Sequence, residues 1–154
     1  MNRADNITTL VDIRRESKFA AILASLTRDP RHYQIAVLSS LLIYGVGWLS
    51  FDVSTEQITI LLGTVVATQF ICAQLPGQAA FDPRSPLISG LSLCLLLRTN
   101  NPLLAVAAAV VAVASKFAIR WNNKHIFNPT NFAIVLMIAV TGEAWASPAQ
   151  WGSK

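Results

Sequence analysis

The chain has 154 residues, of which 53% are apolar and only 13% are charged, and its formal net charge is +4. A soluble domain carries roughly a quarter charged residues. The composition therefore excludes a disordered chain and argues against an ordinary cytosolic enzyme. Together with a mean hydropathy of +0.49, it predicts an all-α, polytopic membrane helical bundle.

Residues 1–32 form a polar segment that holds six of the twelve basic residues, interspersed with acidic ones. No aromatic side chains alternate with the basic ones, which excludes a nucleic-acid-binding surface. Phe19, Ile22, Leu23 and Leu26 recur at helical spacing. Two interpretations stay open: a short amphipathic helix on the membrane surface, or a soluble tail with transient helix. Asp29-Pro30 is expected to end this segment.

Residues 33–154 form the predicted transmembrane domain, with about five apolar segments. A bilayer core of about 30 Å needs roughly 20 helical residues. A capping box at Ser54–Gln57 marks the start of the second segment, and Pro102 opens the fourth at the first helical position. The segments lie at 35–51, 58–75, 86–98, 102–119 and 131–145.

The third and fifth segments have short apolar centres, Leu87–Leu97 and Phe132–Val140, bounded by proline or glycine. Such segments indicate one or two broken or re-entrant helices. The alternative is a full span with polar ends, such as Asn131–Trp145. The fourth segment is rich in alanines spaced four apart, at 105/109, 108/112 and 114/118, a spacing that lets helices approach closely. We therefore expect the fourth segment to lie inside the bundle.

The distribution of lysine and arginine predicts a multi-pass protein of the inner (cytoplasmic) membrane with a cytoplasmic amino terminus. The loop Asp52–Gln57 carries no basic residue, whereas Arg84, Arg120 and Lys124 fall on the side of the basic tail. Only Arg98 disagrees with this orientation. Membrane lipid is thus an expected partner.

The sequence contains no catalytic triad, phosphate-binding loop or zinc-ligand spacing, so no catalytic or metal-binding residue is assigned. Cys72 and Cys94 both lie in apolar stretches and are expected to be buried small hydrophobic residues.

The stretch Lys116–Asn131 is the richest in polar side chains. A helix starting after Asn128 would direct its free N–H groups and positive dipole end at an anion or a carbonyl, with Lys124 and His125 as further donors. Equally, the asparagines could pin a tight loop whose cations lie among lipid headgroups.

This stretch resembles the membrane-subunit family shared by the sodium-translocating NADH:quinone reductase and the Rnf electron-transport complex (NqrB/RnfD-like proteins). KHIFNPTNFAIV at 124–135 is similar to the family's G-K-H-x-F-N-P-A/S-x-F sequence. RDPRHYQ at 28–34 resembles its entry to the first span, and SPLISGLSLCLLL at 85–97 resembles its short S-x-x-x-T/S-G-x-x-x-A/C-L-x-L helix. SPAQWGS at 147–153 resembles a stretch of stand-alone RnfD-like proteins. The resemblance covers about residues 28–153.

The resemblance implies a membrane bundle of two inverted repeats of about five helices, related to urea and ammonium transporters. The chain would match one repeat, an amino-terminal half that pairs with other subunits or with a second five-helix half. The family binds FMN covalently through a threonine in an S-G-A-T-like motif, whereas here Ser89-Gly90 is followed by Leu91-Ser92. The expected cofactor is therefore a non-covalent flavin (FMN or riboflavin) or a quinone. The expected donors are Lys124, His125, Asn128 and Asn131, with Ser89 and Gly90 lining the approach.

Three functions remain open at this point. The first is an integral membrane subunit, or its amino-terminal half, of an RnfD/NqrB-like electron-transport protein coupled to transmembrane ion transport, with at most a non-catalytic, flavin-holding role. The second is half of a small-solute channel or transporter that dimerises. The third is a non-redox membrane partner in a biosynthetic assembly.

Overall fold

A computed structural model describes residues 29–76, 81–121 and 124–147 of the chain. This part is mostly helical, which confirms the all-α prediction. Two short antiparallel strand pairs accompany the helices. The helices within the described ranges are α2 (Pro30–Gly47), α3 (Thr55–Ala73), α4 (Arg84–Leu96), α5 (Pro102–Ala118) and α6 (Pro129–Thr141).

Three of the helices start with the same local chemistry, a capping side chain followed by proline. Asp29 accepts a hydrogen bond from the Arg31 N–H, and Asn101 accepts one from the Leu103 N–H, each at 3.0 Å. Asn128 does the same for α6. Proline at the first helical position is tolerated because its missing N–H would have no partner inside the helix. Asp29-Pro30 therefore begins α2; the segment that it was predicted to end lies outside the described residues.

One of the two hydrogen bonds of the capping box predicted for α3 is present. The Ser54 Oγ accepts a hydrogen bond from the Gln57 N–H at 3.0 Å. The helix then runs to Ala73, close to the predicted end of the second segment. The fourth segment also agrees with its prediction, because α5 begins at Pro102 and ends at Ala118.

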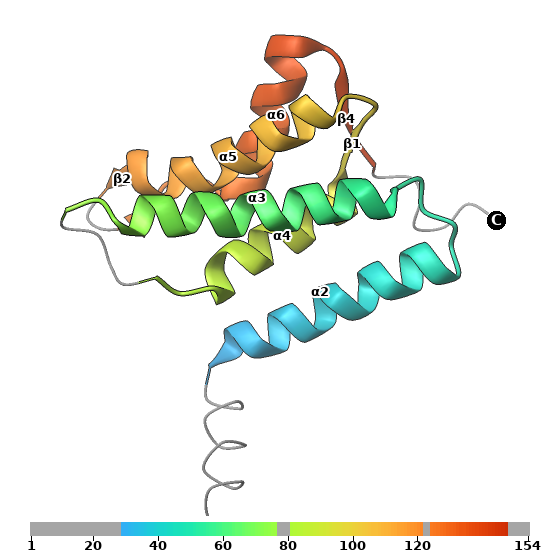
Figure 1. Cartoon of the computed structure of the whole chain (residues 1–154), viewed down its shortest axis with the longest axis horizontal. Coiled ribbons are helices and arrows are strands. Elements are labelled where there is room, and N and C mark those ends of the chain that lie inside the picture. Colours follow the sequence, from blue (N-terminus) through green and yellow to red (C-terminus); the bar gives the residue numbers. More distant parts are fainter. Residues whose placement is uncertain (1–28, 77–80, 122–123, 148–154) are drawn as a thin grey trace, which may run out of the picture.

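The helices alternate in direction along the chain (Figure 1). α2, α4 and α6 start at the end of the molecule where α3 and α5 finish. β2 (Arg120–Trp121) and β3 (Lys124–His125) pair at that end, between α5 and α6. At the opposite end, β1 (Leu97–Thr99) after α4 pairs antiparallel with β4 (Ala144–Ala146) after α6. The two short helices are thus joined through the segments that follow them.

α4 and α6 have 13 residues each, which at 1.5 Å per residue gives about 20 Å. α4 ends because Leu97 turns to extended geometry, and the buried Arg98 side chain donates to the carbonyls of Cys94 and Leu97. α6 ends at Gly142, whose positive φ of 66° suits glycine as a helix cap. Both segments therefore contain a short helix, and α6 ends at Thr141, before the end of the Asn131–Trp145 span that was the alternative.

The core lies where α4 and α5 meet their neighbours. Ala105, Ala108, Ala109 and Ala112 of α5 have no exposed surface, so this helix lies inside the bundle as its alanine spacing predicts. Ala114 and Ala118 lie outside this buried stripe. Cys94 is fully buried, as expected, whereas Cys72 is only half-buried.

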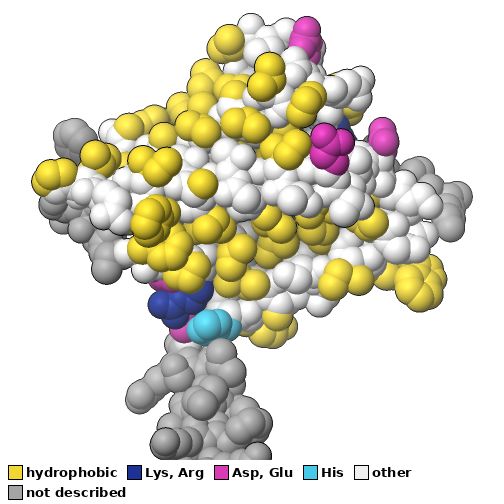
Figure 2. Space-filling model, viewed as in Figure 1, with side chains coloured by type: hydrophobic (Ala, Val, Ile, Leu, Met, Phe, Trp, Pro, Cys, Tyr) yellow, Lys and Arg dark blue, Asp and Glu magenta, His cyan; other side chains and the backbone are white. Residues whose placement is uncertain are grey.

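Apolar side chains also cover the outside of the molecule. Five large apolar side chains are each at least 64% exposed: Tyr33, Ile43, Leu103, Val135 and Val140. Figure 2 shows apolar side chains spread along the helices, with the charged side chains of this face gathered toward the ends. Of the described helices, α3 alone is both long and apolar enough to cross a bilayer by itself; α4, α5 and α6 are apolar but shorter. α2 has the length, but Arg31 and His32 make its first turn polar.

The predicted boundary between residues 1–32 and 33–154 falls inside the first turn of α2. The amphipathic helix predicted near Phe19–Leu26 lies outside the described residues. The first predicted segment, 35–51, corresponds to α2, but its last four residues leave the helix, and Phe51 turns back to be buried.

Candidate functional site

The predicted site centres on the start of α6, where Asn128 acts as the helix cap. Its Oδ1 accepts hydrogen bonds from the N–H groups of Thr130, at 3.0 Å, and Asn131, at 3.4 Å. The Phe132 N–H donates to the Asn128 carbonyl, and Pro129 has no N–H. The first turn of α6 therefore has no backbone donor left for a ligand, so the expectation of free N–H groups there was wrong.

The other predicted donors lie beside this cap along the chain. In the β2–β3 pair, Lys124 is opposite Trp121 and His125 is opposite Arg120. The side chains of Lys124 and His125 lie outside the described part of the structure. Asn131 is on the first turn of α6 and is exposed. The hairpin thus places these backbone positions between the end of α5 and the start of α6, the location that the sequence predicts.

Ser89 and Gly90 lie within α4 and serve its packing. The Ser89 Oγ donates to the Ser85 carbonyl one turn earlier, at 3.4 Å. A Cβ placed on Gly90 would lie 2.8 Å from Val65 Cγ2 and 2.9 Å from Leu62 Cδ2 of α3. Gly90 is therefore the point of close approach between α3 and α4. Both residues are buried, and Gly90 packs against α3.

Lys116, near the end of α5, is a buried cation that the sequence analysis did not select. Its side chain is only 5% exposed, and its ammonium donates to the carbonyl and the Oγ of Ser85, both at 3.1 Å. These bonds tie the end of α5 to the first turn of α4. The sequence signal for this residue was a single lysine within an alanine-rich apolar segment. A charge buried in such a segment requires a polar partner.

A crevice beside Lys116 separates the end of α5 from the start of α6. It is lined by Ser115, Lys116, Phe127 and Phe132, among others, and leaves no room for a water molecule. The rings of Phe127 and Phe132 stack with their centroids 5.9 Å apart. A ligand of any size would therefore have to approach the edge of this crevice from outside.

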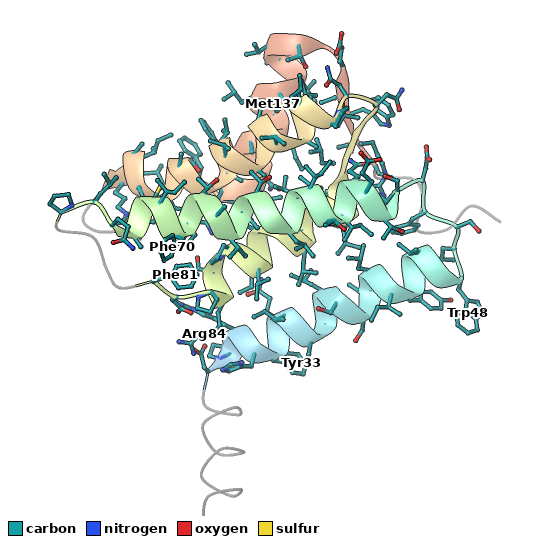
Figure 3. All side chains as sticks on the ribbon, viewed as in Figure 1. Tyr33, Trp48, Phe70, Phe81, Arg84 and Met137 are labelled. Atoms are coloured by element: carbon teal, nitrogen blue, oxygen red, sulfur yellow. The ribbon has the colours of Figure 1, made fainter. Side chains whose placement is uncertain are left out.

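An ion-pair network holds the start of α2 against the start of α4. Arg84 bonds Asp29 at 2.6 Å and Asp82 at 2.9 Å, and Arg31 bonds Asp82 at 3.0 Å. The hydrogen bond from the Arg84 side chain lowers the pKa of Asp82 from its ordinary value of 3.8. Figure 3 shows Arg84 beside the first turn of α2, close to Phe81. Phe81 in turn meets Phe70 of α3 edge to face, with ring centroids 5.8 Å apart.

Three hollows lie at the other end, around β1 and the starts of α3 and α5. Three adjoining cavities of about 120, 230 and 440 Å³ share Asn100 in their walls. We call them together the strand-end hollow. Its lining includes Asp52, Glu56, Gln57, Arg98, Asn100, Glu143 and Trp145. The sequence did not reveal this hollow, because its lining residues come from three separate stretches of the chain, within 52–60, 98–105 and 143–145.

Among the described residues, no group of histidine, cysteine or carboxylate side chains is arranged to hold a metal ion. Comparison with protein-family models, curated proteins and solved structures finds no match to this chain.

Proposed function

We propose that this chain is an integral membrane subunit of an NqrB/RnfD-like electron-transport complex coupled to ion transport. The observation that carries the membrane part is the position of charge in the helices. Within the described helices, charged side chains occur only in the first or last turn, at Arg31, Glu56, Arg84 and Lys116. The helix centres between them are uncharged, and their outward faces expose large apolar side chains.

An apolar surface of this extent needs a cover. Lipid acyl chains would cover it without further protein, and helices satisfy their own backbone polar groups inside a bilayer. α4 and α6, at about 20 Å each, are shorter than the bilayer core of about 30 Å. Short helices that end in irregular or extended segments within the protein are typical of membrane proteins that hold a site near mid-membrane.

The electron-transport part of the proposal rests on the resemblance of KHIFNPTNFAIV and the neighbouring motifs to this family. A non-covalent flavin or a quinone would be held at the end of the molecule that carries Lys124, His125, Asn128 and Asn131. The crevice there is closed, so we place the cofactor at the boundary with another subunit or a second five-helix half. The protein would supply binding, orientation and electrostatics, and the cofactor would supply the redox chemistry.

Two measurements test the proposal in sequence. Alkaline carbonate extraction of membranes that contain the full chain should leave the protein in the pellet; release into the supernatant as a monodisperse, detergent-free protein would overturn the membrane assignment. Mild-detergent purification through a tag on this chain should then recover partner subunits with the visible absorbance of a flavin or an extractable quinone. Recovery of partners without either cofactor would indicate a non-redox membrane partner instead.

A second candidate function is half of a small-solute pathway. The strand-end hollow favours it, because charged and amide side chains, among them Glu56, Gln57 and Arg98, line this space at one end of the bundle. Flux of a small solute into proteoliposomes above that of empty vesicles, without bound flavin, would support this alternative over electron transport.

A further inference from the structure

Ser85 and Lys116 form a close polar pair between the start of α4 and the end of α5. The Lys116 side-chain nitrogen lies 3.1 Å from the Ser85 Oγ and 3.1 Å from the Ser85 carbonyl oxygen. Lys116 is 5% exposed, whereas Ser85 is only half-buried. A lysine amine within hydrogen-bond distance of a serine hydroxyl is an arrangement that activates serine as a nucleophile. The pair thus has the geometry of a serine–lysine dyad, with the serine as the more accessible member.

Lys116 also has the surroundings that a lysine base requires. Both of its hydrogen bonds go to Ser85, and no carboxylate among the described residues forms an ion pair with it. Ala112 and Val113, about one turn earlier on α5, are fully buried. Lysines that are desolvated in apolar surroundings without a counter-ion serve as bases in covalent catalysis. In its neutral form, the Lys116 nitrogen would accept the hydroxyl proton of Ser85 across the same short distance.

The first turn of α4 supplies a free backbone donor at the serine itself. The N–H groups of Arg84 and Leu87 are both bonded to acceptors, and Pro86 has no N–H. The Ser85 N–H has no acceptor within the described structure. The N–H groups at the start of a helix carry the positive end of its dipole and favour negative charge. Such donors, the N–H of the nucleophile included, stabilise the oxyanion that forms when serine attacks a carbonyl.

An exposed apolar surface lies next to this pair. Phe81, four residues before Ser85, is 39% exposed and meets Phe70, which is 53% exposed, edge to face. Figure 3 shows both rings beside Arg84, the residue that precedes Ser85. Exposed aromatic rings bind hydrocarbon through their apolar faces. A substrate that reaches Ser85 from outside would therefore gain affinity from an apolar chain attached to its carbonyl carbon.

We propose that Ser85 and Lys116 are a catalytic pair that hydrolyses acyl esters with an apolar chain. The Ser85 Oγ attacks the ester carbonyl carbon, and its proton passes to the neutral Lys116 amine. The tetrahedral intermediate then breaks its bond to the alcohol oxygen, which takes the proton from Lys116 as the alcohol leaves. Water attacks the acyl-serine in the same manner, and its proton passes through Lys116 to the Ser85 Oγ as the carboxylic acid leaves. This inference does not depend on the electron-transport proposal.

The test uses the purified full chain in detergent and a fluorophosphonate, which forms a bond to an activated serine oxygen and releases fluoride. We expect mass spectrometry of the peptides to locate the phosphonate on Ser85. The chain should also hydrolyse p-nitrophenyl butyrate roughly tenfold faster in kcat/KM than p-nitrophenyl acetate, because the longer acyl chain buries more apolar surface. Absence of phosphonate from Ser85, or hydrolysis of neither ester, would overturn the proposal. Equal kcat/KM for the two esters would overturn the preference for an apolar chain.

Variants distinguish a catalytic lysine from one that only joins two helices. Lys116→Arg keeps the positive charge and the hydrogen-bond donors but cannot act as a base. It should fold, as judged by its elution in size-exclusion chromatography, and should lower the rates of phosphonate labelling and ester hydrolysis by about a hundredfold. Unchanged rates in folded Lys116→Arg would show that the bond to Ser85 is structural and would contradict the proposal.

Ser85→Ala tests the nucleophile directly. It removes a half-buried hydroxyl and leaves the carbonyl partner of Lys116 in place, so it provides the decisive variant if Lys116→Arg fails to fold. It should abolish both labelling and hydrolysis. Ser40→Ala is the matched control, because Ser40 is an exposed serine of α2 whose Oγ donates to the Ala36 carbonyl of its own helix. Loss of labelling or hydrolysis in Ser40→Ala, or their survival in Ser85→Ala, would refute the assignment.

Discussion

Single charged residues at the start of α2 and α4 join two helices that are far apart in the sequence. Arg84 contacts both Asp29 and Asp82, so one guanidinium connects the cap of α2 to the residues before α4. These side chains are partly exposed, and exposed ion pairs contribute only about 0.2–1 kcal/mol each. We infer that the network orients the two helix starts more than it stabilises the fold.

The first prediction concerns the pH dependence of this network. Because the pKa of Asp82 is lowered in the folded state, the ion pair stabilises the protein above pH 3.8, the ordinary value, and the contribution is lost as the pH falls through the lowered pKa. Asp82→Asn should therefore lower the free energy of unfolding by about 0.5 kcal/mol at pH 6 and by less at pH 3, below the ordinary pKa of 3.8. Denaturant unfolding in detergent at the two pH values measures this. An equal loss at both would show that charge is not the cause.

Single residues also show where sequence reasoning was incomplete. Asn128 was selected as a ligand donor, yet its Oδ1 is used to cap α6. The cap uses the side-chain oxygen as an acceptor, whereas the predicted donor role would use the Nδ2 amide. Arg98 was counted against the predicted orientation as a loop cation, but it is buried and caps α4. Its position therefore carries no topological information.

At the scale of elements, α3 and α4 approach each other at one glycine. The neighbours that a Cβ on Gly90 would meet, Val65 and Leu62, belong to α3, and Val65 is fully buried. A buried side chain has little space into which it can move. The separation of these two helices therefore depends on the absence of a side chain at position 90.

The second prediction follows from this contact. Gly90→Ala should destabilise the protein by about 1–3 kcal/mol through overpacking, and Val65→Ala in the same chain should recover part of the loss. Gly63→Ala is the matched control on α3, because a Cβ there meets nothing within 4 Å. Thermal unfolding in detergent compares the variants. Equal midpoints for Gly90→Ala and Gly63→Ala would disprove the close approach.

Across the whole molecule, charge is separated between the two ends of the bundle. Among the residues that the structure describes, the end where α2, α4 and α6 start carries Arg31, Arg84, Lys116, Arg120 and Lys124, against two carboxylates, Asp29 and Asp82. The described part of the strand end carries Arg98 against Asp52, Glu56 and Glu143. Lysine and arginine are enriched on the cytoplasmic side of membrane proteins, so we propose that the basic end is cytoplasmic.

The third prediction tests this orientation. In a Cys72→Ala, Cys94→Ala background, a cysteine at the exposed position Asn100 should react with a membrane-impermeant maleimide in spheroplasts. A cysteine at the exposed position Asn131, on the first turn of α6, should react only after the membrane is opened. Labelling of Asn131→Cys before opening, with Asn100→Cys protected, would reverse the orientation. Labelling of both would contradict a membrane between the two ends.

The sequence by itself determined the helical class, the order of the helices and some of their ends. The physical reason is that caps, prolines and apolar runs act over a few neighbouring residues. Ser54 and Pro102 mark the starts of α3 and α5, and Gly142 marks the end of α6. The alanine spacing of α5 likewise predicted which helix is buried, because it repeats with the helical period.

Only the tertiary structure decided which residues meet. The bond from Lys116 to Ser85, the contact of Gly90 with Val65 and the strand-end hollow each join residues far apart in the sequence. Such contacts depend on how helices pack, and no local pattern encodes the partner of a given side chain. The pairing of β1 with β4 is the clearest example, because it brings the segments after α4 and α6 together and places Arg98 opposite Trp145.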